Sequence, residues 1–303
     1  MSVLSADSLP AALPASVVDV AAVLDRCARK SWHQGIAFRC WGEGPALVLV
    51  HGGVGSWTHW VRSIAPLAAR FTVHAIDLPG FGESPDVPAD VTPDGYLDWV
   101  AGAVKDVALG SPGGQAAIVG FSFGGVVAAA VTGRIGSVAR RLSLIGPGGF
   151  GEPVGRSIPV RKRPKGGDDM QLLREVTAYN LGQWMLSEPP AVDDPVIDLH
   201  LANLARARYD SRLIGWRPTL LPDLARTSCP VQILWGDGDR LAHPSVQERR
   251  AKCLAVRPDL QTAVIADCGH WAQYARPEAI HEHLLAFHGH SCNDSEHTTD
   301  LPT

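Results

Sequence analysis

Ser122 stands between Gly120 and Gly124 in the stretch VGFSFGGVVA, where an apolar run gives way to small residues. A serine hydroxyl is a weak nucleophile unless a base takes its proton, and the base needs a carboxylate to orient it. Glycines two residues before and after the serine let a strand turn sharply into a helix, because side chains there would collide. The G-x-S-x-G pattern therefore predicts an exposed nucleophilic serine, with a plain strand-to-helix turn as the alternative.

Candidates for the acid and the base follow two later apolar runs, in the chain order serine, acid, histidine that this pattern requires. Asp237 and Asp239 come directly after VQILWG, and His270 comes three residues after TAVIAD. If both runs are strands of one parallel sheet, their carboxyl ends meet at the same edge as Ser122. This order predicts a Ser-Asp-His arrangement for acyl transfer, with either aspartate as the acid.

The stretch HGGVGSW at 51–57 follows the apolar run ALVLV and supplies a glycine-rich loop at the same edge. Acyl transfer needs two N–H donors aimed at the developing oxyanion. The backbone N–H groups of Phe123, directly after the serine, and Gly53 are the natural pair. The alternative is a glycine-rich turn without a catalytic role.

Short buried runs that alternate with helical patterns must position these residues, and this alternation predicts a doubly wound, mostly parallel α/β sheet. From residue 151 to residue 222 no buried strand is expected, and helical patterns begin at Asp168 and at Asp193 or Asp194. We interpret this region as a helical cap over the carboxyl edge. The expected strands are 46–50, 71–80, 116–120, 141–149, 231–236 and 262–267. The expected domains are a core of 31–150 and 223–290, a cap of 151–222, an N-terminal helical extension of 1–30 and a disordered tail of 291–303.

The composition excludes several classes of protein. The 303 residues are 46% hydrophobic and 19% charged, with a formal net charge of −4, which argues against nucleic acid as a partner. No apolar run approaches the length that spans a bilayer, and the N-terminus lacks a basic signal-peptide region, so we expect a cytoplasmic protein without a membrane partner. No residue cluster has metal-ligand spacing and no nucleotide fingerprint is present, so no metal or cofactor is expected. A homo-oligomer stays open.

The landmarks HGG, DLPGFGESP, GFSFGG, WGDGD and GHWAQ follow one another in the order of the α/β-hydrolase superfamily, which the chain resembles over roughly residues 35 to 290. The resemblance implies the α/β-hydrolase fold and a cofactor-free serine hydrolase. It also implies that Asp239, three residues after the glycine of W-G-x-x-D, is the acid, with Asp237 as the fallback. Ser122, His270 and Asp239 are then the catalytic residues.

Within the superfamily, GHWAQYARPE is similar to the meta-cleavage-product hydrolases, which cleave a C–C bond in a vinylogous diketone acid. This resemblance implies that Trp271 and a cap-helix arginine, either Arg206 or Arg208, contact the substrate. Phe121 stands where that family usually has asparagine, and HGGVG replaces its H-G-x-G-P-G. Phe121 is therefore expected at the substrate, and ester, lactone, thioester and amide substrates stay open beside C–C compounds.

The helical period selects between the two arginines. Ile197, Leu201 and Leu204 form one apolar stripe, and four residues further this stripe reaches Arg208, whereas Arg206 lies half a turn away. We therefore expect Arg208 to point into the pocket and bind a substrate carboxylate, with an internal salt bridge as the alternative.

The expected substrate is a small molecule with a carbonyl group, either derived from an aromatic compound or bearing a carboxylate. A lyase that uses the same three residues, and a ligand receptor that closes its cap for signalling, are the alternatives to a hydrolase. The basic stretch 156–165 predicts a solvent-exposed loop, with recruitment of an anionic ligand as its alternative.

Overall fold

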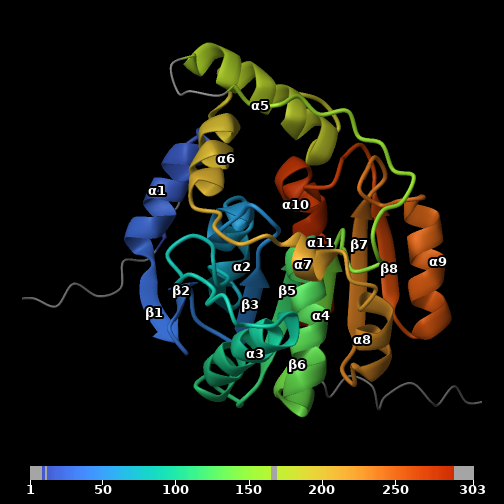
Figure 1. Cartoon of the computed structure of the whole chain (residues 1–303). Helices are drawn as coiled ribbons and strands as arrows, with labels where there is room; N and C mark the ends of the chain where they lie inside the picture. Colours follow the sequence, from blue (N-terminus) through green and yellow to red (C-terminus); the bar gives the residue numbers. More distant parts are fainter. Residues whose placement is uncertain (1–8, 11, 165–168, 290–303) are drawn as a thin grey trace, which may run out of the picture.

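An eight-stranded sheet forms the centre of the computed structural model, which describes residues 9–10, 12–164 and 169–289 (Figure 1). The strand order is β1-β2-β4-β3-β5-β6-β7-β8. β2 pairs antiparallel with both β1 and β4, and every other neighbouring pair is parallel. The strands are β1 (Arg29–His33), β2 (Ile36–Trp41), β3 (Ala46–Val50), β4 (Thr72–Ile76), β5 (Ala116–Phe121), β6 (Ala139–Ile145), β7 (Val231–Gly236) and β8 (Gln261–Ile265).

The six predicted strands are confirmed as β3 to β8. β3, β5 and β7 are buried along their whole length, as short apolar runs in parallel sheets typically are. The prediction missed β1 and β2. The β1 sequence RKSWH is mostly polar because it forms an exposed edge of the sheet. β2 is wholly buried although it contains Arg39, whose charge is offset by ion pairs to Asp25, Asp77 and Glu83.

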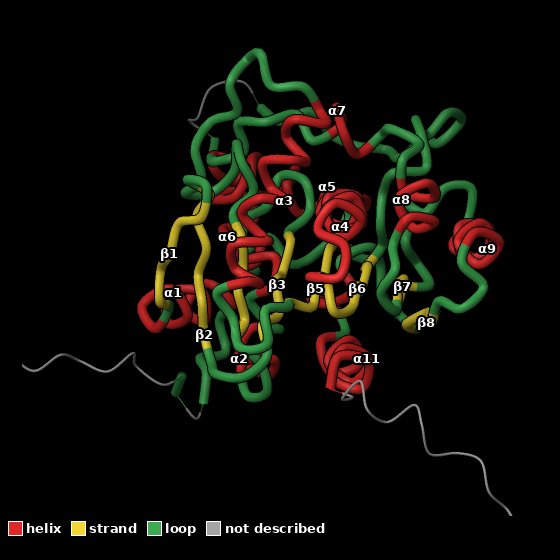
Figure 2. The backbone as a smooth tube through the Cα atoms, turned by 90° about the horizontal axis from the view of Figure 1, so that it is seen from below, coloured by secondary structure: helices red, strands yellow, loops and turns green. Residues whose placement is uncertain are grey.

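Helices cover both faces of the sheet (Figure 2). One buried cluster lies between the sheet and α3, α4, α8 and α9, and a second lies between the sheet and α1, α2, α10 and α11. The helices are α1 (Val17–Cys27), α2 (Ile64–Ala68), α3 (Pro93–Leu109), α4 (Phe123–Ile135), α5 (Met170–Trp184), α6 (Pro195–Ala205), α7 (Arg212–Gly215), α8 (Leu220–Arg226), α9 (Val246–Val256), α10 (Ala272–Ala275) and α11 (Pro277–Gly289), with 3₁₀ turns η1 (Trp57–Trp60) and η2 (Gly136–Val138).

The segment between β6 and β7 contains α5 to α8 and no strand among its described residues. α6 starts where its sequence predicts, because the Asp194 carboxylate accepts a hydrogen bond from the Val196 N–H and Pro195 occupies the first turn. The Asp169 carboxylate caps α5 in the same way, while Asp168 lies outside the described residues. α5 and α6 lie beyond the carboxyl edge of the strands (Figure 1).

The proposed boundary between an N-terminal extension and the core needs correction. α1 forms within the predicted extension, but β1 begins at Arg29 and pairs along its whole length with β2. A boundary between residues 30 and 31 would therefore cut a strand. The predicted tail 291–303 lies outside the described residues.

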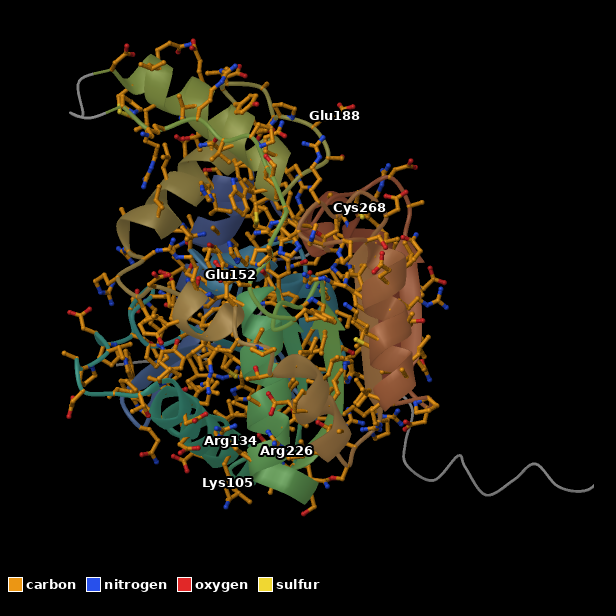
Figure 3. The ribbon with its side chains drawn as sticks, turned by 45° about the vertical axis from the view of Figure 1, so that its right-hand side comes forward. Lys105, Arg134, Glu152, Glu188, Arg226 and Cys268 are labelled. Carbon is orange, nitrogen blue, oxygen red and sulfur yellow. The ribbon has the colours of Figure 1, made fainter. Side chains whose placement is uncertain are left out.

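The loops after α5 and β8 lie at one end of the molecule, and the carboxyl ends of α3, α4 and α8 lie at the opposite end (Figure 3). Figure 3 shows Glu188, after α5, and Cys268, after β8, at the upper end of the molecule. Lys105, Arg134 and Arg226, near the carboxyl ends of their helices, lie at the opposite end. Among the helices of the described ranges, none combines the length and the apolar character that a membrane crossing requires.

Candidate active site

Ser122 occupies the turn between β5 and α4 in a strained backbone conformation, with φ 54° and ψ −115°. Backbone bonds hold this turn in place. The Ser122 N–H donates to the Ile145 carbonyl (2.9 Å), and the Ser122 carbonyl accepts from the N–H groups of Gly125 (3.0 Å) and Gly148 (3.1 Å). The side chain makes no cap bond to α4 and lines a pocket, so the hydroxyl is available at the helix N-terminus.

The glycines of the turn permit a close approach between the helix and the strands. A Cβ on Gly120 would lie 2.6 Å from Cβ of Ala128, and a Cβ on Gly124 would lie 2.5 Å from the Val50 carbonyl oxygen. The second collision is with backbone of β3, which cannot move aside without disturbing the sheet. Both glycines are therefore required by packing, as the sequence pattern predicts.

Gly124→Ala should lower the free energy of unfolding by about 3 kcal/mol, the upper end of the usual cost of overpacking, because the added Cβ meets rigid backbone. Gly133→Ala, in the same helix, is the matched control. Its added Cβ would meet nothing closer than 4.0 Å, and alanine is the better helix former, so stability should hold or rise slightly. Urea denaturation of both variants checks the prediction, and similar stabilities would contradict it.

His270 and Asp239 lie together at the carboxyl ends of β8 and β7. The His270 Nδ1 is 2.8 Å from Asp239 Oδ2, and the other oxygen of this carboxylate accepts from the Leu241 N–H (2.9 Å). An ionised carboxylate can only accept, so Nδ1 carries the proton and Nε2 has a free lone pair. The His270 Nε2 is buried without a hydrogen-bond partner in the described part of the chain.

Asp237 lies outside this arrangement. Its carboxylate accepts from the N–H groups of Asp267 (3.1 Å) and Cys268 (3.2 Å), in the loop that leads to His270. Burial acts to raise the pKa of Asp237, but these backbone donors outweigh it and hold the pKa below its ordinary value. The geometry favours Asp239 as the partner of the histidine.

Two buried histidines support the HGG loop. The Nε2 of His51 accepts from the Leu78 N–H (3.0 Å), so its Nδ1 donates to the Gly52 carbonyl (2.7 Å). The Gly52 N–H donates to Nδ1 of His59 (3.2 Å). Burial lowers the pKa of both imidazoles, which are therefore neutral at pH 7. The Gly52 N–H is therefore engaged, and Gly53, which lines the pocket, remains the candidate donor of this loop.

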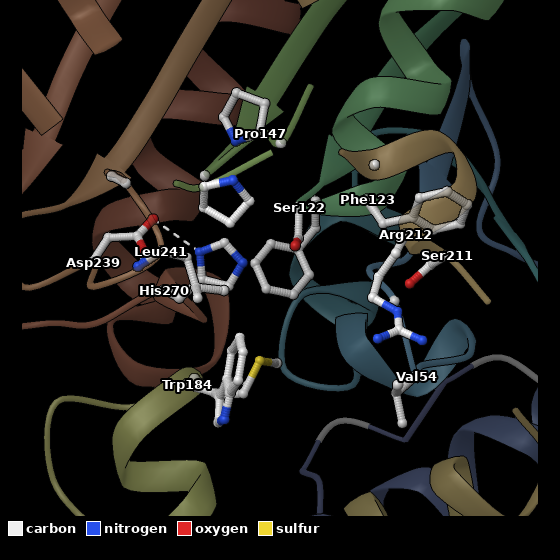
Figure 4. Close-up of a pocket in the computed structure, with 18 of the residues that line it drawn as sticks. Val54, Ser122, Phe123, Pro147, Trp184, Ser211, Arg212, Asp239, Leu241 and His270 are labelled. Atoms are coloured by element: carbon white, nitrogen blue, oxygen red, sulfur yellow. Dashed lines mark hydrogen bonds and ion pairs between the residues drawn. The ribbon is translucent and has the colours of Figure 1, made fainter. Parts of the chain in front are cut away.

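The pocket has a volume of about 390 Å³ and lies between the strand ends and the α5–α7 segment. In Figure 4, Asp239 and Leu241 lie on one side of Ser122, and Val54, Ser211 and Arg212 lie on the other. The predicted residues that line it are Gly53, Phe121, Ser122, Phe123, Asp239 and His270.

The predicted placement of Arg208 is wrong. α6 ends at Ala205, so the helical period cannot be extended to residue 208. The Arg208 side chain is 37% exposed, pairs with Asp86 and donates to the carbonyl of Ser84 (2.6 Å). Arg208 is absent from the pocket wall, and the alternative of an internal salt bridge describes it better. Arg206, the residue after the helix, does not line the pocket either.

Trp271 also lies elsewhere than expected. It is 1% exposed and is not part of the pocket wall. Its indole N–H donates to the His59 carbonyl (3.0 Å), and its ring stacks on Tyr274 (4.3 Å between centroids). The side chain therefore packs between η1 and α10, where it supports the loop without reaching the pocket.

Sequence reasoning missed all four arginines of the pocket wall, which are Arg156, Arg163, Arg212 and Arg249. Arg156 belongs to the basic stretch that we interpreted as an exposed loop, but it is half-buried and lines the pocket. Arg249, in α9, had no signal beyond its charge. Arg212 is the first residue of α7 and forms an ion pair with Asp210.

Comparison with known proteins agrees with this architecture. Residues 47–283 match the alpha/beta hydrolase family. A 2-hydroxy-6-oxo-6-phenylhexa-2,4-dienoate hydrolase of Burkholderia cepacia is 28% identical over 81% of this chain and 88% of its own length. An uncharacterized protein of Mycobacterium tuberculosis is 29% identical over 80% of this chain and 74% of its own length.

Solved structures share the fold at lower identity. A carboxylesterase of Bacillus subtilis superposes with a TM-score of 0.63 at 21% identity, covering 87% of this chain and 92% of its own. A meta-cleavage product hydrolase superposes with a TM-score of 0.65 at 19% identity, covering 87% and 98%. The fold and the family match define the chain as a hydrolase. It belongs to the alpha/beta hydrolase family.

Proposed function

We propose that the chain is a cofactor-free serine hydrolase that cleaves an ester-type or C–C bond next to a carbonyl group in a small molecule. The observation that carries the proposal is the buried, unpartnered Nε2 of His270, whose Nδ1 is held by Asp239. This nitrogen faces the pocket that Ser122 lines, on a turn whose strain exposes the hydroxyl. A free basic nitrogen beside an exposed serine is the arrangement that nucleophilic acyl transfer needs.

In the proposed reaction, the Ser122 oxygen attacks the carbonyl carbon while Nε2 of His270 takes its proton. Asp239 holds the imidazole tautomer and stabilises the imidazolium. The N–H groups of Gly53 and Phe123 bind the oxyanion of the tetrahedral intermediate. His270 then gives the proton to the leaving group, and water hydrolyses the acyl-enzyme through the same base.

The wall of the pocket is partly apolar and partly positively charged, and the substrate should match both parts. Phe121, Leu181, Trp184 and Trp216 give it apolar surface, and arginines give it positive charge. The name of the Burkholderia cepacia hydrolase describes an acid with a carbonyl group, which supports a substrate that carries both a carbonyl group and a carboxylate. Esters with an apolar acyl group agree equally well with this wall.

A substrate panel tests the proposal. Purified protein should turn over esters or dienone acids many times per molecule, and a fluorophosphonate probe should label one serine, mapped to Ser122 by peptide sequencing. Binding without turnover would instead favour a receptor. Turnover without labelling, and with loss of a proton from the substrate, would favour a lyase.

A further inference from the structure

Arg249 brings a buried positive charge to the pocket wall. It is 7% exposed, and it donates from Nε to the His243 carbonyl (2.9 Å) and from Nη1 to the Pro147 carbonyl (3.3 Å). Its guanidinium lies 4.2 Å from the ring centre of Phe150. These partners fix the group but carry no net charge, and burial lowers the pKa of Arg249 to about 10 despite the opposing effect of Asp239.

Arg156 adds a second charge to the same part of the pocket. It donates from Nη1 to the Leu241 carbonyl (3.3 Å), and burial lowers its pKa although Asp239 acts to raise it. The neighbouring Arg156 guanidinium also acts to lower the pKa of Arg249. Within the described residues neither arginine forms an ion pair, and the nearby Asp239 already binds the imidazole.

The arginine at the other end of the pocket is different. Arg212 lies across Ser122 from Leu241 (Figure 4), and Asp210 binds it through two oxygens at 2.8 and 2.7 Å. Its charge is therefore compensated inside the protein. A desolvated cation without a counter-ion is costly, and the cost is removed when an anion binds with charge-assisted hydrogen bonds. The Leu241 end of the pocket is thus prepared for an anion, and the Arg212 end is not.

We propose that Arg156 and Arg249 form an anion subsite that binds a carboxylate in the leaving-group half of the substrate. The assignment to this half rests on the proposed function, in which His270 delivers a proton to the leaving group. The leaving group must then depart on the His270 side of Ser122, and the two arginines lie on that side, next to Asp239. The acyl half extends toward Arg212, where the positive charge is already paired.

Three substrates of similar size test the subsite. The first is the acetate ester of a short hydroxycarboxylic acid, which carries the carboxylate in the leaving group. The second is its neutral primary amide. The third is a mono-ester of a dicarboxylic acid, which carries the carboxylate in the acyl half. The wild type should prefer the first. Arg156→Ala should lower kcat/KM for the first by about 10- to 100-fold, and for the other two by less than about 2-fold.

Matched variants separate recognition from folding. Arg208→Ala removes an arginine that pairs with Asp86 outside the pocket, so it should leave all three rates unchanged. Arg156→Lys and Arg249→Lys keep the charge and should retain part of the preference for the first substrate. An equal loss on all three substrates would overturn the proposal in favour of a structural role. A selective loss on the acyl-half acid would overturn the assignment to the leaving group.

A binding measurement keeps this inference separate from the catalytic proposal. In the Ser122→Ala background, a short hydroxycarboxylate should raise the melting temperature, and the added change Arg156→Ala should abolish that shift. A shift that persists without Arg156 would overturn the subsite whether or not the protein turns over esters. Loss of turnover preference with an intact, Arg156-dependent shift would instead contradict the proposed reaction.

Discussion

Replacing Ser122 with alanine should lower kcat by roughly 10⁶-fold on every substrate that the wild type cleaves, because the nucleophile, base and acid act as a unit. The melting temperature should not change. The turn is held by backbone bonds to Ile145, Gly125 and Gly148, which do not involve the hydroxyl. Alanine also keeps the Cβ that the φ of 54° already accommodates. Steady-state kinetics and thermal denaturation check both parts.

Ser211 provides the control, since it is the other serine among the described residues of the pocket wall. Its Oγ lies 2.6 Å from where a Cβ on Gly53 would be, so it is close enough to the site to react with a probe. The fluorophosphonate should label Ser211→Ala and should not label Ser122→Ala. Labelling of Ser122→Ala at Ser211 would show that the nucleophile was assigned to the wrong side chain.

The parts of the site that follow strand ends could be predicted from the sequence. Ser122, Asp239 and His270 each come within a few residues of a buried apolar run, and parallel strands bring their carboxyl ends to one edge. At these three residues the sequence motif also predicts the position in the fold, because the end of each strand is fixed by the sheet. The same reasoning predicted six strands. It missed β1, which is mostly polar, and β2, whose apolar residues are interrupted by Arg39.

Side chains on helices and loops were harder to predict. Arg208 was placed by extending a helical period, but α6 ends at Ala205 without a glycine or proline to mark the end. Arg249 stands in the polar stretch VQERRAKC beside Arg250, and residue type does not distinguish them. Arg249 faces the pocket, whereas Arg250 donates to Thr262 at the surface. Tertiary packing selects between them, and a single sequence contains no signal of that choice.

Trp271 shows a related limit. Its place after His270 in the sequence suggests a place beside the substrate, but neighbouring residues of a loop point in different directions. Trp271 precedes α10 and turns toward η1, where it binds the His59 carbonyl. Its consequence for function is indirect, since it connects the loop of His270 to the loop of Gly53. Proximity in sequence to a functional residue therefore predicts packing against it as readily as contact with a ligand.

Asp239→Asn should lower kcat by about 10⁴-fold, because an amide in place of the carboxylate no longer fixes the tautomer of His270 that accepts a proton at Nε2. Asp237→Asn should keep kcat within about 10-fold of wild type. Asp237 binds the N–H groups of Asp267 and Cys268, and an amide oxygen can still accept from at least one of them.

The two variants are matched in chemistry and differ by two positions in one loop, so comparison of their kcat and melting temperatures isolates the role of each carboxylate. Asp237→Asn should lower the melting temperature while kcat stays close to the wild-type value, because its carboxylate orders the loop that leads to His270. If Asp237→Asn lost most of its kcat and Asp239→Asn kept it, the carboxylate of Asp237 would be the group that orients His270 during turnover. The 2.8 Å contact between His270 and Asp239 would then have to break when substrate binds.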